Sequence, residues 1–260
     1  MKTVKILIIL GFFSMSVYGQ SDPKEIMKKS RDQAKIAGLE TKTTLEINDG
    51  KGNQRIRETT MASRIFPDGT EKRVIVFLAP ADVKGTSMLI YDYDKKADDM
   101  WIYMPALRKS RKIVSSDKTK SFMGSEFSNS DLSIGTIDDF TYTIEGTETI
   151  DQQECWKIRL TPSTPEIAAE NGVSYKLMWI GKKDFMPRKT QFIGQDGSPV
   201  KELAYSGIKL LDPKANKYYI THMEMKNLKN KRFSVMNMDQ VSVNPRVNEE
   251  YFTLSFLEKQ

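Results

Sequence analysis

Short runs of alternating apolar and polar residues, separated by turn residues, are the feature that most constrains the fold of this chain. Phe140, Tyr142 and Ile144 alternate with polar residues, and the same period of two recurs around Trp156 and Trp179. Successive side chains of a strand point to opposite faces, so this period predicts strands with one buried face. Turns rich in Gly, Pro, Asn and Asp separate the runs at residues 48–52, 67–69, 194–197 and 212–213. Such short connections favour an antiparallel, mainly β protein over βαβ units.

Helical segments are expected before the first and after the last of these strands. Asp22 suits the N-cap and Pro23 the first position of a helix that Gly38 should end. Residues 248–257 are expected to form a short helix or an irregular cap.

The single cysteine, Cys155, cannot form an internal disulfide, so the chain must rely on its apolar core. Cys155 alternates with Trp156 and Ile158, which predicts that it lies on the polar side of its strand. We find no internal repeat or low-complexity linker, and therefore expect residues 20–260 to form a single domain.

Residues 1–19 have the pattern of a cleaved signal peptide. Two lysines precede an apolar run at residues 6–13, and residues 17–19 offer a small-residue cleavage site. The run is too short to span a bilayer, although an uncleaved anchor is the alternative. No cysteine follows it that could carry a lipid. We therefore expect a mature chain that begins near Gln20 and is soluble in the periplasm of a Gram-negative bacterium.

The formal net charge of +6 raises the question of an anionic partner. An exported chain rarely meets nucleic acid, and no recognition helix or RNA-type aromatic motif is present. An anionic membrane surface or lipid is the expected partner, and a generically basic exported protein is the alternative.

Catalytic and metal-binding patterns are scarce. His222, the only histidine, lies in a predicted strand, and no Gly-x-Ser-x-Gly motif is present. One histidine and one cysteine cannot form a common zinc site. The pairs Asp98-Asp99 and Asp138-Asp139 lack EF-hand spacing, and no phosphate-binding glycine motif occurs. We therefore expect no enzymatic activity, no metal and no cofactor.

The stretch from residue 77 to residue 132 begins with a predicted hairpin. Residues 86–93 and 100–105 alternate as two strands joined by a charged turn, and Pro105 ends the second. The densest basic cluster of the chain follows, at residues 108–112.

Residues 115–132, which we call the lid segment, contain large apolar side chains in a polar setting. Phe122, Met123 and Phe127 surround Gly124 among Ser, Glu and Asn residues. Exposed apolar side chains of this kind predict a mobile cover over an apolar site. A long surface loop with a few anchoring aromatics is the alternative.

Three blocks of this stretch carry a resemblance to a known family: FLAPADVKGTSMLIY, WIYMPALRKSRKI and FMGSEFSNSDL. They resemble the bacterial outer-membrane lipoprotein-sorting protein family, which is similar in fold to the LolA and LolB carriers. Later blocks, such as YKLMWIGKKDFMPRKTQFIGQDGSPVKEL, extend the resemblance over nearly all of the mature chain. The resemblance implies a strongly curved antiparallel sheet that forms an open half-barrel. Helices and a lid would lie on its concave side, over a hydrophobic cavity for acyl chains.

The resemblance also implies a function. We expect a carrier or binder of lipidated cargo, either lipoprotein acyl chains or lipid, for transfer toward the outer membrane. Its partners would be an inner-membrane exporter and, transiently, the membrane surface, and the protein would be a monomer. The alternatives are an envelope-stress sensor domain and an accessory lipid-binding protein of a resistance-nodulation-division exporter, and a secreted hydrolase ranks behind both. Fourteen methionines would suit a cavity for disordered chains, or would simply fill an irregular core.

The predicted lipid-binding residues are apolar side chains of the hairpin and the lid segment: Phe77, Met88, Ile90, Trp101, Tyr103, Met104, Phe122, Met123 and Phe127. Opposite strand faces cannot both point inward, so Met88 with Ile90 and Trp101 with Tyr103 are alternative sets. The predicted headgroup- or partner-binding residues are Arg108, Lys109, Arg111 and Lys112, with a solvated charge run as the alternative. Because a lid makes few core contacts, polar replacements of Phe122 and Phe127 should weaken lipid uptake with little change in thermal midpoint.

Overall fold

The computed structural model describes residues 22–259, and the predicted signal peptide at residues 1–19 lies outside the described residues. Thirteen strands form one antiparallel sheet in the order β6-β5-β4-β3-β2-β1-β13-β12-β11-β10-β9-β8-β7. The strands are β1 (Gly38–Asn48), β2 (Gln54–Ile65), β3 (Glu71–Ala79), β4 (Ser87–Asp92), β5 (Asp99–Met104), β6 (Lys109–Lys112), β7 (Phe140–Ile150), β8 (Gln153–Pro162), β9 (Tyr175–Gly181), β10 (Pro187–Ile193), β11 (Pro199–Asp212), β12 (Lys217–Asn227) and β13 (Phe233–Val243). The sheet stays open, with β6 and β7 at its edges, which confirms the predicted half-barrel.

The helical elements are short. They are α1 (Pro23–Ala34), α2 (Ser115–Lys118), α3 (Pro165–Asn171) and α4 (Leu254–Leu257), with 3-10 turns at Pro105–Leu107, Asn129–Leu132, Ile137–Asp139 and Glu249–Phe252. Within residues 22–259, no helix has the length and apolar composition needed to cross a membrane.

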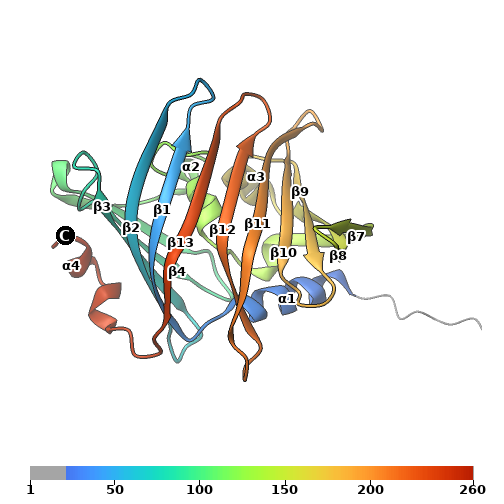
Figure 1. Cartoon of the computed structure of the whole chain (residues 1–260), viewed down its shortest axis with the longest axis horizontal. Coiled ribbons are helices and arrows are strands. Elements are labelled where there is room, and N and C mark those ends of the chain that lie inside the picture. The colour runs from blue at the N-terminus through green and yellow to red at the C-terminus, as the bar shows by residue number, and fades with distance from the viewer. Residues whose placement is uncertain (1–21, 260) are drawn as a thin grey trace, which may run out of the picture.

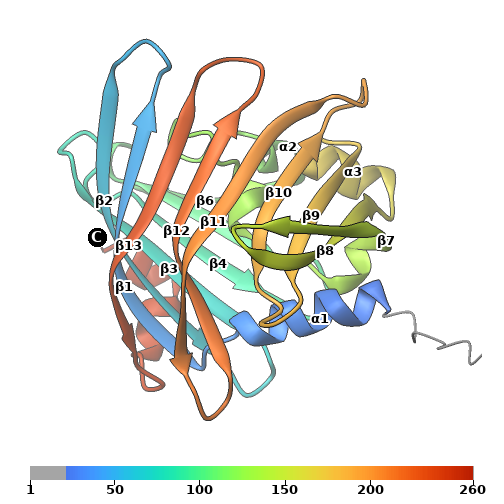
Figure 2. The ribbon, with the colours of Figure 1, turned by 45° about the vertical axis from the view of Figure 1, so that its right-hand side comes forward.

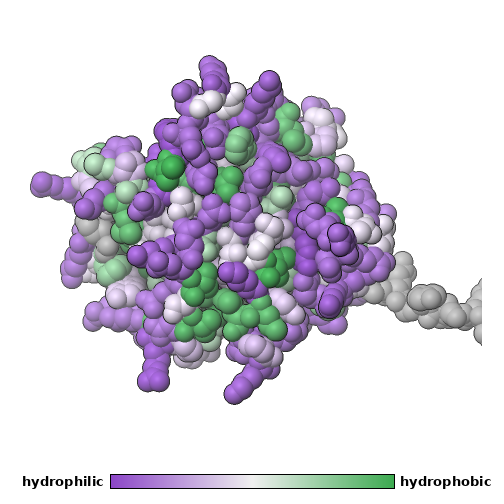
Figure 3. All heavy atoms as spheres, viewed as in Figure 1, coloured by the Kyte–Doolittle hydropathy of each residue, from purple (hydrophilic) through white to green (hydrophobic). Residues whose placement is uncertain are grey.

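The first and last strands meet in the middle of the sheet, where β1 pairs with both β2 and β13. From this centre, β2 to β6 extend the sheet in one direction and β12 to β7 extend it in the other. The sheet bends as it extends, so that β3, β4 and β6 pass behind β1 and β11–β13 (Figures 1 and 2). One outer face is mostly hydrophilic, with hydrophobic residues gathered toward its lower centre (Figure 3).

A large apolar cluster identifies the concave face. It joins side chains of β1 and β3–β5 to side chains of β10–β13, and only curvature can bring such distant strands together. We call it the concave cluster, and its buried members are Leu45, Ile47, Phe77, Val83, Met88, Ile90, Met100, Ile113, Phe122, Phe127, Val173, Phe192, Leu203, Met225 and Met236. Each such side chain contributes roughly 1.5–3 kcal/mol when fully buried, so this cluster is a major source of stability for the curved sheet.

Helix α1 packs on the same face, farther toward β7. Its Ile26 and Met27 belong to one apolar cluster with Ile158 of β8. Ile158 pairs with Met178 of β9 and, through β10, lies in register with Leu203 of the concave cluster, so α1 and this cluster share a face of the sheet. The predicted cap is confirmed, since the Asp22 side chain accepts a hydrogen bond from the Lys24 backbone N–H.

The C-terminal cap, residues 249–257, covers the opposite, convex face. Phe252 and Leu257 are buried against Val74, Leu89 and Tyr103, whose neighbours along the strands face the concave cluster. The expectation that helices lie on the concave side therefore holds for α1 and the lid segment, but not for this cap.

The sequence suggested that Gly38 ends α1, and this prediction was wrong. The helix ends at Ala34, and Gly38 begins β1 beside the chain that leaves β13. A Cβ on Gly38 would lie 2.2 Å from the Asn244 carbonyl oxygen, so this glycine allows two backbones to approach closely.

The placement of Cys155 on a polar face was also wrong. Its side chain is fully buried with Leu177, Trp179 and Ile193, while Ile158 packs under α1 on the other face. Because both faces of β8 are covered here, alternation along the strand does not separate polar from apolar surroundings. Burial raises the pKa of the Cys155 thiol.

Candidate functional site

The lid segment belongs to the connection that links the two edges of the sheet. Residues 113–139 leave β6, cross the concave side and enter β7 at the opposite edge. Phe122 and Phe127 are only 3% and 2% exposed, and both belong to the concave cluster. The Phe122 ring lies 5.7 Å from the Phe77 ring, between centroids. The expectation that these apolar side chains are exposed was therefore wrong, because they fill the inside of the sheet.

A tight turn places the two phenylalanines together. The Phe122 N–H donates to the Phe127 carbonyl oxygen at 2.8 Å, and Met123 and Gly124 between them have φ values of 52° and 80°. Glycine adopts this left-handed conformation easily, whereas at Met123 it carries strain. Met123 is half-buried and packs against the concave cluster.

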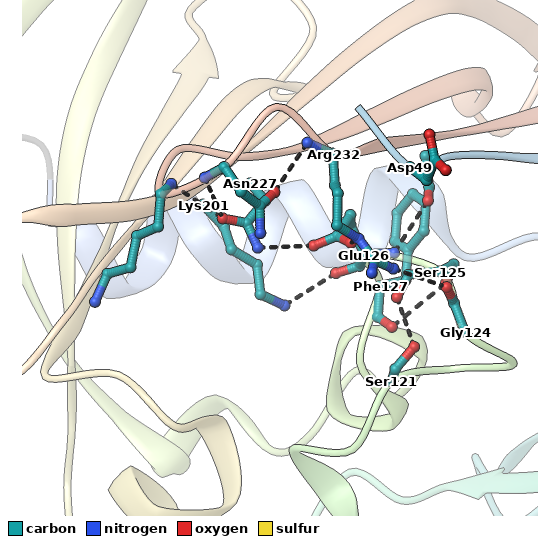
Figure 4. Close-up of polar contacts among 12 residues, drawn as sticks. Asp49, Ser121, Gly124, Ser125, Glu126, Phe127, Lys201, Asn227 and Arg232 are labelled. Carbon is teal, nitrogen blue, oxygen red and sulfur yellow. Dashed lines mark hydrogen bonds and ion pairs between the residues drawn. The ribbon is translucent and has the colours of Figure 1, made fainter. Parts of the chain in front are cut away.

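Glu126 holds the tip of the lid segment to the strands opposite (Figure 4). Its carboxylate accepts hydrogen bonds from Arg232 Nε at 2.6 Å and from Asn227 Nδ2 at 2.9 Å. Its backbone carbonyl accepts from Lys201 Nζ at 3.1 Å, and its N–H donates to Ser234 Oγ at 3.0 Å. These contacts, which we call the latch, join the lid to β11–β13 and their hairpin and leave Glu126 91% buried.

The far end of the lid segment is held by a buried ion pair on β3 and β4. Arg73 Nη2 donates to Asp92 Oδ2 and to the Leu132 carbonyl oxygen, both at 2.7 Å. The Ile134 N–H donates to Asp92 at 2.9 Å, and the Gly135 N–H donates to Asp98 at 2.8 Å. Burial, reinforced by the nearby Asp92 carboxylate, raises the pKa of Asp98 to about 6.

A groove of about 390 Å³ opens beside the latch. Most of its lining residues are polar, and they come from the lid, β11, β12 and the β12–β13 hairpin: Thr119, Ser121, Gly124, Ser125, Glu126, Phe127, Ser128, Lys201, Asn227, Asn230 and Arg232. Phe127 both lines this groove and belongs to the concave cluster, so the groove lies next to that cluster.

The predicted lipid-binding residues divide between the two faces of the sheet. Met88 and Ile90 of β4 face the concave cluster with Phe77, while Trp101 and Tyr103 of β5 pack on the convex side under the C-terminal cap. The first alternative set is therefore the one that the structure brings together with Phe122 and Phe127. Met104 is half-buried at the end of β5, in register with Lys109. Their role in lipid binding remains a prediction.

The basic cluster forms the edge strand β6 and its approach, which the sequence did not predict. Lys112 pairs with Asp99 at 2.5 Å, and Arg111 pairs with Asp117 at 2.6 Å. Arg108, in the left-handed conformation, and Lys109 are exposed. Two of the four predicted headgroup-binding side chains are thus engaged in ion pairs within the chain.

Sequence reasoning missed the latch. Glu126 lies inside the quoted block FMGSEFSNSDL, where a carboxylate between two phenylalanines was a local signal for a buried contact. Arg232, its main partner, is 106 residues away, and no pattern in the sequence connects the two.

The residues that could support catalysis lie in ordinary structural positions. His222 Nδ1 is 2.6 Å from Asn237 Oδ1 on the neighbouring strand. In the described part of the chain, no group of three or more His, Cys, Asp and Glu side chains could hold a metal ion.

A second groove, of about 550 Å³, lies on the convex side between the C-terminal cap and β1–β3 and β13. Its apolar lining includes Val76, Leu78, Tyr251 and Phe256. It is the competing place for an apolar ligand.

Comparisons with known proteins agree on the fold. Residues 69–259 match a family described as an uncharacterized protein, and no curated protein matches the chain. The structure is similar to a domain described as outer membrane lipoprotein-sorting from Vibrio parahaemolyticus, with a TM-score of 0.82 and 22% identity over 91% of this chain and 98% of that one. It is similar to a DUF1329 family protein from Desulfovibrio piger, with a TM-score of 0.82 and 26% identity over 91% and 100% of the two chains. A LolA superfamily protein from Nitrosomonas europaea matches with a TM-score of 0.68 and 16% identity, again over 91% and 100%.

Proposed function

This chain belongs to the family described as an uncharacterized protein, and its fold is similar to that of a LolA superfamily protein. From this premise we propose that it carries lipidated cargo through the periplasm toward the outer membrane. The cargo would be lipoprotein acyl chains or lipid, held on the concave side of the sheet. An inner-membrane exporter and the membrane surface would be transient partners of a monomeric carrier.

The concave cluster is the observation that carries this proposal. Four methionines are among its buried members, and Met123, Met223 and Met238 pack against it. Unbranched, flexible side chains can adapt to acyl chains of varied shape. Each buried methylene is worth roughly 0.8 kcal/mol, so one long acyl chain would gain on the order of 10 kcal/mol before ordering costs.

Cargo would have to displace Phe122 and Phe127, because they occupy the concave cluster. The lid segment has no strand pairing to the sheet. Phe122 and Phe127 pack into the concave cluster, and polar contacts at Glu126 and Leu132 hold the segment to the strands. Displacing it therefore leaves the strand ladders intact. The phenylalanines would be exchanged for acyl chains of similar polarity, which keeps the concave face covered in both states.

A carrier needs no catalytic group, so the single cysteine and the single histidine of the chain need no chemical role in this function. The Cys155 thiol is buried on the convex face with a raised pKa, so little of it would be thiolate at neutral pH. His222 is paired with Asn237 in the sheet, away from both grooves.

Transfer between vesicles tests the proposal. The mature chain, residues 20–260, should accelerate movement of a fluorescent triacylated peptide from donor to acceptor vesicles, and mass spectrometry should find amphiphile bound to it. Absence of both acceleration and bound amphiphile would contradict the proposal.

Two matched variants locate the activity. Ile102→Ser alters a half-buried side chain packed against the concave cluster and should slow transfer several-fold. Leu78→Ser alters a side chain that is 40% exposed in the convex groove and should leave transfer unchanged. The reverse result would move the site to the convex groove.

A further inference from the structure

Arg57 of β2 is a buried cation, and part of its hydrogen-bonding capacity is left unused. Its side chain is 7% exposed, and among the described residues its Nε and Nη1 atoms have no hydrogen-bond partner. An arginine stays charged, and a buried charge without a partner is costly. Such a group is rarely retained without a counterpart, so its position in the fold is informative.

The strand register places Arg57 on the concave face. It pairs with Leu45 of β1, a member of the concave cluster, so both side chains lie on the same side of the sheet. Two residues along β2, Thr59 pairs with Phe77 of the same cluster. Two residues of a strand span about 6.6 Å. Arg57 therefore lies about that distance along β2 from Thr59, the residue that pairs with Phe77.

Arg57 also lies toward the tip of the lid segment. Arg55, the next side chain on the same face, approaches Gly124 of the lid, since a Cβ on that glycine would be 3.5 Å from Arg55 Nη2. Asp82, in the loop after β3, attracts the guanidinium electrostatically but is exposed and does not bond to Nε or Nη1. Arg55 repels the Arg57 guanidinium more weakly than Asp82 attracts it, and Asp82 leaves Nε and Nη1 without a hydrogen bond.

We propose that Arg57 binds an anionic oxygen of the cargo, either the phosphate of a phospholipid or the carboxylate of a fatty acid, while its acyl chains enter the concave cluster. This inference rests on the proposed carrier function and specifies the chemistry of the cargo. The position between the lid tip and the apolar cluster matches an amphiphile, whose charged group adjoins its chains. A guanidinium suits phosphate and carboxylate equally, because both offer two oxygens to its planar donors.

A pair of fluorescent probes that differ only in charge provides the test. Parinaric acid presents a carboxylate, and its methyl ester presents the same chain without the charge. Arg57→Gln should weaken binding of the acid by about ten- to a hundredfold, the range of a hydrogen bond to a charged group, and leave binding of the ester within about twofold. Arg57→Lys, which keeps the charge, should retain part of the affinity for the acid.

Two controls separate this loss from a change in overall charge or stability. Lys42→Gln removes one positive charge from an exposed position on the neighbouring strand and should change neither affinity. The thermal midpoint of ligand-free Arg57→Gln should not fall below that of the wild type, because the substitution removes an unpartnered charge. Equal weakening for acid and ester, or no weakening of the acid, would overturn the inference.

The two sources of the anion are distinguished by displacement of bound parinaric acid. Competition by phosphatidylglycerol but not by oleate would identify the phosphate, and the opposite result would identify the carboxylate. If the wild-type chain binds neither the acid nor the ester, the carrier proposal fails and this inference fails with it. If it binds both and Arg57→Gln leaves both unchanged, only the inference fails.

Discussion

Phe122 and Phe127 contribute to stability as well as to any contact with cargo, because both are buried among residues of distant strands. Phe122→Ala should lower the free energy of unfolding by about 3–5 kcal/mol, the usual cost of truncating a core aromatic. Urea unfolding followed by circular dichroism measures this change. Leu228→Ala is the control, since Leu228 is 46% exposed and its truncation should have little effect. An unchanged stability in Phe122→Ala would restore the original expectation of a lid with few core contacts.

Asp98 should make stability depend on pH. Burial raises its pKa from 3.8 to about 6, so the stability linked to this group is fully present below pH 3.8 and is lost as the pH rises through 6. The corresponding loss has an upper bound of about 3 kcal/mol. Asp98→Asn has no such titration, so the difference in stability between wild type and variant should change between pH 4 and pH 6.5. Denaturant unfolding at several pH values measures it, and a constant difference across this range would contradict the assignment.

At the scale of elements, the latch should control how often the lid segment opens. Glu126→Gln keeps the shape of the side chain but removes the charge that Arg232 Nε binds at 2.6 Å. We expect faster amide hydrogen exchange over residues 119–131, by about tenfold or more, because a hydrogen bond to a charged group is worth about 1.5–3 kcal/mol.

The control for this variant is Glu154→Gln. Glu154 pairs with Lys182 but is 62% exposed, and such surface pairs contribute little. It should leave exchange in the lid segment unchanged. If Glu126→Gln also leaves it unchanged, the latch does not limit lid opening.

The sequence predicted elements whose signals are local. The β4–β5 hairpin and the turns at residues 194–197 and 212–213 occur where alternation and turn residues placed them. The edge strand β6 was missed because four consecutive basic or polar residues do not alternate, and pairing with β5 with the help of Asp99 determines their conformation. The latch was missed for the same reason, since Glu126 and Arg232 meet only after the sheet has curved.

At the scale of the whole molecule, the open sheet determines the path of the connection between its two edges. The strands β6 and β7 are the edges, and the connection between them must cross the concave side. A segment there can cover the concave cluster without interrupting any ladder of the sheet. The sequence indicated the apolar residues of this segment. It did not indicate that they would be buried, because their surroundings include strands as distant along the chain as β1 and β13.

Photo-cross-linking of an acyl chain tests most directly whether the concave cluster receives the cargo. Phosphatidylglycerol with a diazirine near the end of one acyl chain would be loaded onto the mature chain, illuminated, and the labelled peptides identified by mass spectrometry. We expect labels on concave residues such as Met88, Ile90 and Phe122. Labels confined to Leu78, Tyr251 and Phe256 of the convex groove would contradict it.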